Sequence, residues 1–93
     1  RSGDPLFTVY AIPNGLTHGR LGITVSRKVS VLAVRRNRVK RLIRETFRQN
    51  PDSVRGMDLT VLAQRATTST TNKDIIASLE NHWIRARARC VKS

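Results

Sequence analysis

Arginine is the residue type with the clearest chemical use in this sequence, because it is abundant and concentrated in one segment. Ten of the 18 basic residues lie between Arg20 and Arg48 against a single acid, Glu45, so this segment carries +9 of the chain's net charge of +12. A planar guanidinium can hold a phosphate through two parallel hydrogen bonds. The segment therefore indicates a binding site for a polyanion, with nucleic acid first and an anionic membrane surface second.

The residue types that catalyse hydrolysis are few and dispersed. No two of the six acids have the local spacing of a two-metal carboxylate site, and there is no glycine-rich phosphate-binding loop. The single cysteine, Cys90, can form neither an intramolecular disulfide nor a cysteine-based zinc site. His18 is expected in a hairpin loop and His82 at a partly exposed helical position. We therefore expect no catalytic residues, no metal site and no cofactor held by the side chains of this chain alone.

The elements that must position the arginines follow from the hydrophobic pattern. Three β-forming segments, 6–12, 21–26 and 57–63, have the composition or the alternation of half-buried strands. Two segments with helical periodicity, 36–49 and 72–89, complete a β-β-α-β-α order. The length and a hydrophobic content of 39% allow one domain with one core. This order predicts an α+β fold with helices packed on one side of a small sheet, whose other face is partly open.

The first predicted helix separates apolar from basic residues. At 100° per residue, one arc of the helix is mostly apolar and contains Val39, Leu42, Ile43, Thr46 and Phe47. The opposite side is polar and mostly basic, and it contains Arg36, Asn37, Lys40, Arg41, Arg44 and Arg48. Arg38 lies apart from this arc, and Arg41 has the spacing to pair with Glu45. Such a side can follow RNA phosphates; the plain alternative is a solvated basic face on an ordinary amphipathic helix.

The second predicted helix begins at Thr71 and Asp74, which have the spacing of a capping box. Its acids lie early and its arginines late, which complements the helix dipole. Its expected buried stripe consists of Ile76, Leu79, Trp83, Ala86 and Cys90.

The open face of the predicted sheet is a second candidate surface. It contains Thr8 and Tyr10 on one strand and the small residues Gly22, Thr24 and Ser26 on another. A single nucleic-acid strand could stack on Tyr10, because stacking on an aromatic ring tolerates any base. An ordinary solvent-exposed face explains the same residues equally well.

The segment 35–45, RRNRVKRLIRE, resembles the signature helix of the protein subunit of bacterial ribonuclease P, in which an R-N-R triplet is followed by K-R and a later R-E. Here the triplet is Arg36-Asn37-Arg38. The preceding strand LGITVSRK, the following strand MDLTVLAQR and a last helix with a bulky apolar residue at Trp83 match the family in order and spacing. The resemblance covers essentially the whole chain, 1–93.

This resemblance implies a fold and a function. The fold would contain a left-handed βαβ crossover, an exception to the usual handedness, and is shared with a domain of a ribosomal protein. The function would be that of the small subunit of a ribonucleoprotein endonuclease whose RNA uses Mg²⁺ to remove the 5′ leader of precursor tRNA, in the cytoplasm and without a membrane partner. Family members begin with a helix that we expect this sequence to lack, and its absence would expose sheet surface to self-association.

The resemblance also implies roles for individual residues. The residues expected to face the catalytic RNA are Arg38, Lys40, Arg41, Arg44 and Arg48. The residues expected to touch RNA backbone before the helix are Arg27 and Lys28. The residues expected to line the leader cleft are Thr8, Tyr10, Thr24, Arg36 and Asn37.

Two other classes of protein are compatible with parts of this evidence. A structural ribosomal protein shares the small size, the high charge and the α+β elements. A protein nuclease that needs no RNA is disfavoured, because the sequence offers no evident catalytic site. Co-purification with one RNA of a few hundred nucleotides and precursor-tRNA cleavage would favour the ribonuclease P subunit, and co-purification with ribosomal subunits would favour the ribosomal protein.

Overall fold

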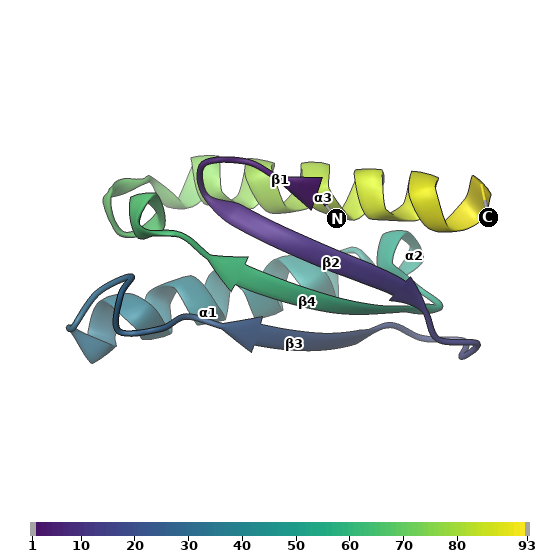
Figure 1. Ribbon diagram of the computed structural model, residues 1–93, viewed down its shortest axis with the longest axis horizontal. Helices are drawn as coiled ribbons and strands as arrows, with labels where there is room; N and C mark the ends of the chain where they lie inside the picture. Colours follow the sequence, from purple (N-terminus) through teal and green to yellow (C-terminus); the bar gives the residue numbers. More distant parts are fainter. Residues whose placement is uncertain (1, 93) are drawn as a thin grey trace.

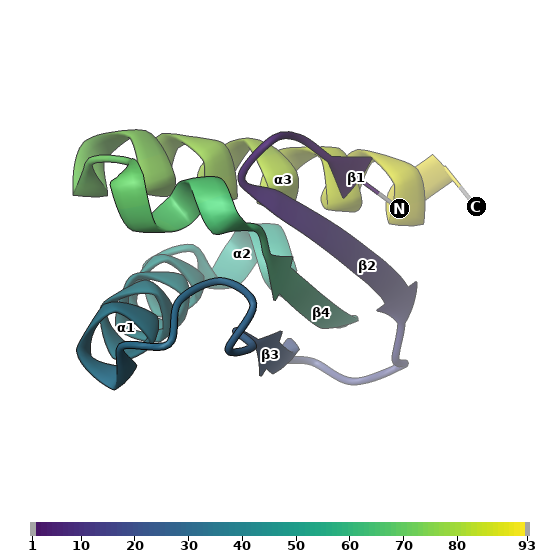
Figure 2. The same ribbon diagram turned by 60° about the vertical axis from the view of Figure 1, so that its left-hand side comes forward.

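The computed structural model describes the backbone of residues 2–92 and the side chains of residues 2–89. It has the predicted α+β architecture, a four-stranded sheet with its helices on one side (Figures 1 and 2). The elements in chain order are β1 (Ser2–Gly3), β2 (Phe7–Pro13), β3 (Arg20–Thr24), α1 (Ala33–Gln49), α2 (Pro51–Val54), β4 (Met57–Ala63), the 3₁₀ helix η1 (Arg65–Ser69) and α3 (Asn72–Lys92).

The sheet has the order β1-β2-β4-β3, so the last strand in the sequence lies between the two longer strands that precede it. β2 is antiparallel to both of its neighbours, whereas β3 and β4 are parallel. In Figure 1 the chain follows β3, returns through α1 behind the sheet and enters β4 above β3. This path is a left-handed crossover, as the resemblance implied, and it differs from most βαβ units.

The core lies between the sheet and the two long helices. β2 and β4 alternate buried and more exposed residues, with Phe7, Val9, Leu59 and Val61 on the buried side. Alternation with a period of two places every second side chain on the helix side, which is why the sequence pattern located these strands. The buried residues contributed by α1 are Val39, Leu42, Ile43 and Thr46. The rings of Phe47 and Trp83, with centroids 6.1 Å apart in a T-shaped arrangement, join α1 to α3.

Two glycines allow close turns at the end of the sheet where β2 stops. A Cβ atom at Gly19 would lie 2.5 Å from the carbonyl oxygen of Val54, so only glycine lets the β2–β3 turn approach α2. Gly56 has a φ of +77°, a left-handed conformation that glycine adopts without a steric penalty, and it connects α2 to β4. The two turns are joined by a hydrogen bond from the Gly56 N–H to the His18 carbonyl oxygen.

Several sequence predictions need correction. α1 begins at Ala33 instead of Arg36, and neither the two-residue strand β1 nor the one-turn helix α2 was predicted. In α3, Ile75 is completely buried, whereas Ile76 is only partly buried. His82 is also completely buried and not partly exposed. The predicted burial of Cys90 lies outside the described side chains.

Candidate RNA-binding surfaces

The side of α1 that faces away from the sheet is the first candidate surface. The structure confirms the predicted division of the helix, because its buried residues lie on the opposite arc. We call Lys40, Arg41, Arg44 and Arg48 the basic side of α1. Arg41 Nε lies 4.0 Å from Glu45 Oε1, which confirms the predicted i,i+4 pair, and both side chains are exposed. Within the described residues, the side chains of the other three basic residues form no hydrogen bond or ion pair, so their donors are available to phosphates.

Arg38 is directed elsewhere, as its angular position predicted. Its Nε donates to Asn72 Oδ1 at 2.8 Å, and its Nη2 donates to the Thr70 carbonyl oxygen at 2.5 Å. The side chain therefore connects α1 to the beginning of α3. Arg36 is also engaged, because its Nη1 donates to the Ser30 carbonyl oxygen at 2.9 Å in the loop before α1. Both residues keep donors that these contacts do not use.

The face of the sheet opposite the helices is the second candidate surface. In one row, Tyr10 on β2 pairs with Thr60 on β4, which pairs with Gly22 on β3. Tyr10 is 43% exposed, and the glycine leaves the far side of the row flat. The adjacent row consists of Thr8, Leu62 and Thr24. We call these six residues the open face.

The two predicted halves of this face, Thr8 with Tyr10 on β2 and the small residues on β3, are separated by β4, so the sequence prediction was incomplete. It therefore missed Thr60 and Leu62, which form the middle of the open face. The alternation within β4 identified which residues face outward. Only the strand order shows that these residues separate the two predicted halves.

One end of the open face is electrically neutralised. Arg20 Nε and Nη2 each lie 2.7 Å from a carboxylate oxygen of Asp58, and Asn14 Nδ2 donates to the same carboxylate at 3.0 Å. The hydrogen bond from Arg20, with that from Asn14, holds the pKa of Asp58 below its usual value. This end therefore offers little net charge to a phosphate.

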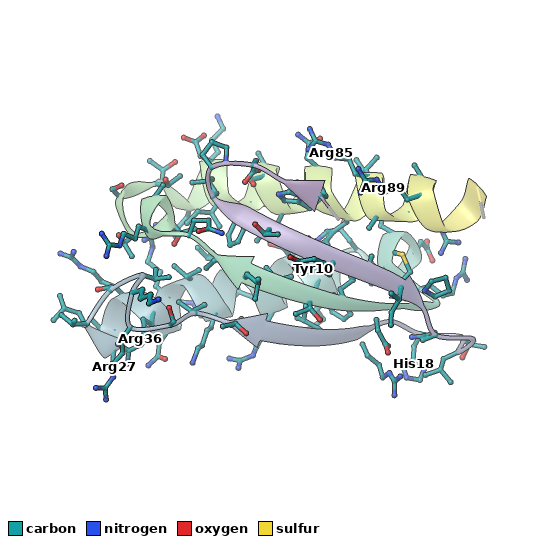
Figure 3. All side chains as sticks on the ribbon, viewed as in Figure 1. Tyr10, His18, Arg27, Arg36, Arg85 and Arg89 are labelled. Carbon is teal, nitrogen blue, oxygen red and sulfur yellow. The ribbon has the colours of Figure 1, made fainter. Side chains whose placement is uncertain are left out.

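The other end is cationic. Figure 3 shows Arg27 and Arg36 at this end and His18 at the neutral end, with Tyr10 between them. A cavity of about 470 Å³ lies where β3 and β4 end, and its lining includes Lys28 and Arg65. Arg65 Nε donates to the Lys28 carbonyl oxygen at 2.9 Å, so the Arg65 side chain extends to the backbone that carries Lys28. Sequence analysis did not single out Arg65, because it follows the strand β4 and not the basic helix.

Asn37, an exposed residue of α1 that follows Arg36, completes the positions that the resemblance assigned to the leader. The structure thus places Thr8, Tyr10 and Thr24 on one face of the sheet and Arg36 beyond its cationic end, with Asn37 next to Arg36 on α1.

The Asp4 carboxylate and the His82 ring, which lie together beside β1, stabilise the fold. Asp4 Oδ1 accepts the N–H groups of Leu6 and Phe7, both at 2.8 Å, and Oδ2 accepts the Ser78 hydroxyl at 2.5 Å. The buried His82 ring lies 2.7 Å from Ser2 Oγ through Nδ1 and 3.1 Å from Asp4 Oδ2 through Nε2. Among residues 2–89, no three His, Cys, Asp or Glu side chains come together as a potential metal site.

This α+β fold, with a basic helix on one side of a sheet and a polar open face on the other, has the features of a small nucleic-acid-binding protein. A family model described as "Ribonuclease P" matches residues 1–87. The ribonuclease P protein components of Methylococcus capsulatus and Nitrosococcus oceani are 43% and 40% identical, over 97% and 100% of this chain and 70% and 78% of their own lengths.

Solved structures agree with these matches. The RNase P protein from Thermotoga maritima, in complex with 1-(4-fluorophenyl)-2-thiourea, superposes with a TM-score of 0.82 at 32% identity, covering 90% of this chain and 82% of that one. The Staphylococcus aureus RNase P protein has a TM-score of 0.78 at 37% identity, covering 86% and 73%. The chain belongs to the ribonuclease P protein family, which decides against the ribosomal alternative.

The chain is therefore a protein subunit of ribonuclease P, the endoribonuclease that removes the 5′ leader from precursor tRNA. None of the helices in the described part of the chain is long and apolar enough to cross a membrane.

Proposed function

We propose that this subunit binds two RNAs on opposite sides of its sheet, and that the RNA subunit performs the hydrolysis. The basic side of α1 would dock on the catalytic RNA, and the open face would hold the single-stranded leader of precursor tRNA. The observation that carries this proposal is the separation of the two surfaces by the core, because one chain can then contact both RNAs at once.

The basic side of α1 is suited to the backbone of a folded RNA. Its three unpaired cations present donors along one side of a rigid helix, and each phosphate contact releases condensed counterions. Arg27 and Lys28, both exposed, extend the same charge to the loop before α1. Arg38 would add its remaining donors beside this surface while it joins α1 to α3.

The open face is suited to a strand whose sequence varies. Tyr10 offers one ring for stacking, and the small residues beside it leave room for the sugar and the base. The cationic end, with Arg36 beyond it and Asn37 next to Arg36 on α1, would take a phosphate of the same strand. Because the precursor carries the leader and the mature tRNA does not, this face would distinguish the two.

The catalytic metal ions would be held by RNA. Asp4 has both carboxylate oxygens occupied by hydrogen bonds within the chain, and Asp58 is occupied by Arg20 and Asn14. These residues do not form the open set of oxygen ligands that Mg²⁺ requires. We therefore place Mg²⁺ on the catalytic RNA and, since precursor tRNA is the substrate, the complex in the cytoplasm.

A pair of variants tests the two surfaces separately. Gly22→Val adds a branched side chain to the open face, where its Cβ atom would lie no closer than 3.9 Å to other atoms, so the fold should tolerate it. In the assembled enzyme, we expect weaker binding of precursor tRNA and unchanged binding of mature tRNA. Arg41→Gln with Arg44→Gln should instead weaken binding of the catalytic RNA and reduce the dependence of log K on log salt by up to about two units.

Each variant is the control for the other. Equal loss of precursor and mature tRNA binding by Gly22→Val would contradict the leader role of the open face. An unchanged salt dependence in the double variant would contradict docking through α1. Cleavage of precursor tRNA by the protein without any RNA subunit would contradict the assignment of catalysis to RNA.

A further inference from the structure

Two adjacent hollows at the end of the molecule where β2 stops are not used by the function proposed above. One, of about 210 Å³, includes Arg48 at the end of α1 and Arg55 after α2 in its lining. The other, of about 470 Å³, includes Arg55 and Arg87 of α3. The hollows share Arg55 and Thr17 in their linings, so they lie next to each other, and we call the two together the depression. Figure 1 shows that α2 lies beside the C-terminal half of α3 at this end.

Among the described residues, the arginines around these hollows have no carboxylate partner. Arg87 Nη1 donates to the Arg55 carbonyl oxygen at 2.6 Å, which fixes its guanidinium while leaving its other donors unused. Within the described residues, the side chains of Arg48 and Arg55 form no ion pair or hydrogen bond. The larger hollow has no acidic residue in its lining, and the smaller has only Asp52.

Three like charges around a shared depression repel one another, and an anion bound between them relieves this repulsion. Guanidinium groups suit phosphate, which they can hold through two hydrogen bonds. Pro13 and Leu16 at the rim of the larger hollow, with Leu16 41% exposed, offer apolar contact to a ribose. The chemistry therefore fits the sugar–phosphate backbone of RNA.

The position of the depression selects which RNA would occupy it. Arg48 is the last member of the basic side of α1, and it also lines the smaller hollow. The open face lies on the other side of the sheet from the helices. We propose that the catalytic-RNA surface continues beyond α1, through Arg55 to Arg87, and that these two arginines bind backbone phosphates of the catalytic RNA. This inference rests on the proposed docking of that RNA on α1.

The test uses the full chain and its ribonuclease P RNA. Arg55→Gln with Arg87→Gln should weaken binding of that RNA and reduce the salt dependence of log K by about one unit for each lost phosphate contact. The matched control is Lys73→Gln with Arg85→Gln, which removes the same charge from exposed positions of α3 that line none of these hollows. The control should change the salt dependence of log K by less than half of the change caused by the Arg55 and Arg87 double variant.

A second variant protects the test against misfolding. Arg55→Gln alone keeps the carbonyl oxygen that accepts the hydrogen bond from Arg87, so the local structure should remain. It should reduce the salt dependence by about one unit without a change in thermal unfolding. Equal effects of the Arg55 and Arg87 double variant and the control would overturn the inference.

Three further outcomes distinguish this inference from the proposed docking on α1. If the Arg55 and Arg87 substitutions leave binding of the catalytic RNA intact and weaken only binding of precursor tRNA to the assembled enzyme, the assignment to the catalytic RNA is wrong. If Arg41→Gln with Arg44→Gln also leaves binding of the catalytic RNA unchanged, the proposed docking on α1 fails together with its extension. If only the α1 variant weakens binding, the extension alone fails.

Discussion

Individual arginines in the signature segment have different uses, although their chemistry is the same. Arg44 is exposed on the basic side of α1, whereas Arg38 donates to Asn72 and Thr70 at the beginning of α3. Helical periodicity set Arg38 apart from the basic arc. It could not identify the partners, because they lie more than thirty residues further along the chain.

Arg38→Ala should reduce the free energy of unfolding by about 1–3 kcal/mol, because it removes two hydrogen bonds that involve a charged donor. Arg44→Ala is the matched control and should leave the free energy of unfolding nearly unchanged. Urea unfolding of both variants at neutral pH provides the measurement. Equal free energies for the two variants would show that the Arg38 contacts do not stabilise the fold.

Among the elements, those with a strong hydrophobic period were predictable and the short ones were not. The strand β4 was predicted with its observed ends, Met57–Ala63, because four apolar residues alternate along it. β1 has only two residues and is held by Asp4 and His82, which are distant from each other in sequence. No local pattern could reveal this contact. The same holds for the open face. Its middle residues, Thr60 and Leu62, belong to it because β4 lies between β2 and β3.

The attachment of β1 to α3 should make stability depend on pH. Burial lowers the pKa of His82 below 6.5, so folding favours the neutral imidazole. For Asp4, burial alone would raise the pKa, but hydrogen bonds from Ser78, Phe7 and Leu6 outweigh it and the pKa lies below 3.8. In both cases the unfolded chain takes up the proton first as the pH falls.

Stability should therefore decrease as the pH falls below about 6.5, because of His82, and again below about 3.8, because of Asp4. His82→Gln keeps a donor and an acceptor for Ser2 and Asp4 but cannot titrate. Its free energy of unfolding should change less between pH 7 and pH 5 than that of the unmodified chain. The same pH dependence in both proteins would assign the effect to other groups.

At the scale of the whole molecule, charge and shape separate the two RNA contacts. The basic side of α1 and the open face lie on opposite sides of the core, so a substitution on one surface removes no contact from the other. The sequence predicted this opposition, because it placed the helices on one side of the sheet and an open face on the other, and the structure confirms that arrangement.

This separation predicts independent energetic effects of substitutions on the two surfaces. Tyr10→Ala should weaken the binding free energy by about 1–3 kcal/mol if a leader base stacks on the ring. Arg44→Gln should weaken it by the contribution of one phosphate contact. The measured quantity is the free energy with which the protein binds a preformed complex of catalytic RNA and precursor tRNA. Because the sites share no partner, the double variant should equal the sum of the single variants within about 0.5 kcal/mol.

Tyr10→Ala with Gly22→Val is the matched pair for this measurement. These two positions lie in one row across Thr60 and would contact the same nucleotides, so their effects should not add. The contrary result would be a coupling energy above about 1 kcal/mol between Tyr10 and Arg44, as large as that between Tyr10 and Gly22. Such a coupling would mean that one RNA contacts both surfaces. The two RNAs would then not be bound on opposite sides of the sheet, and the separation of roles would have to be abandoned.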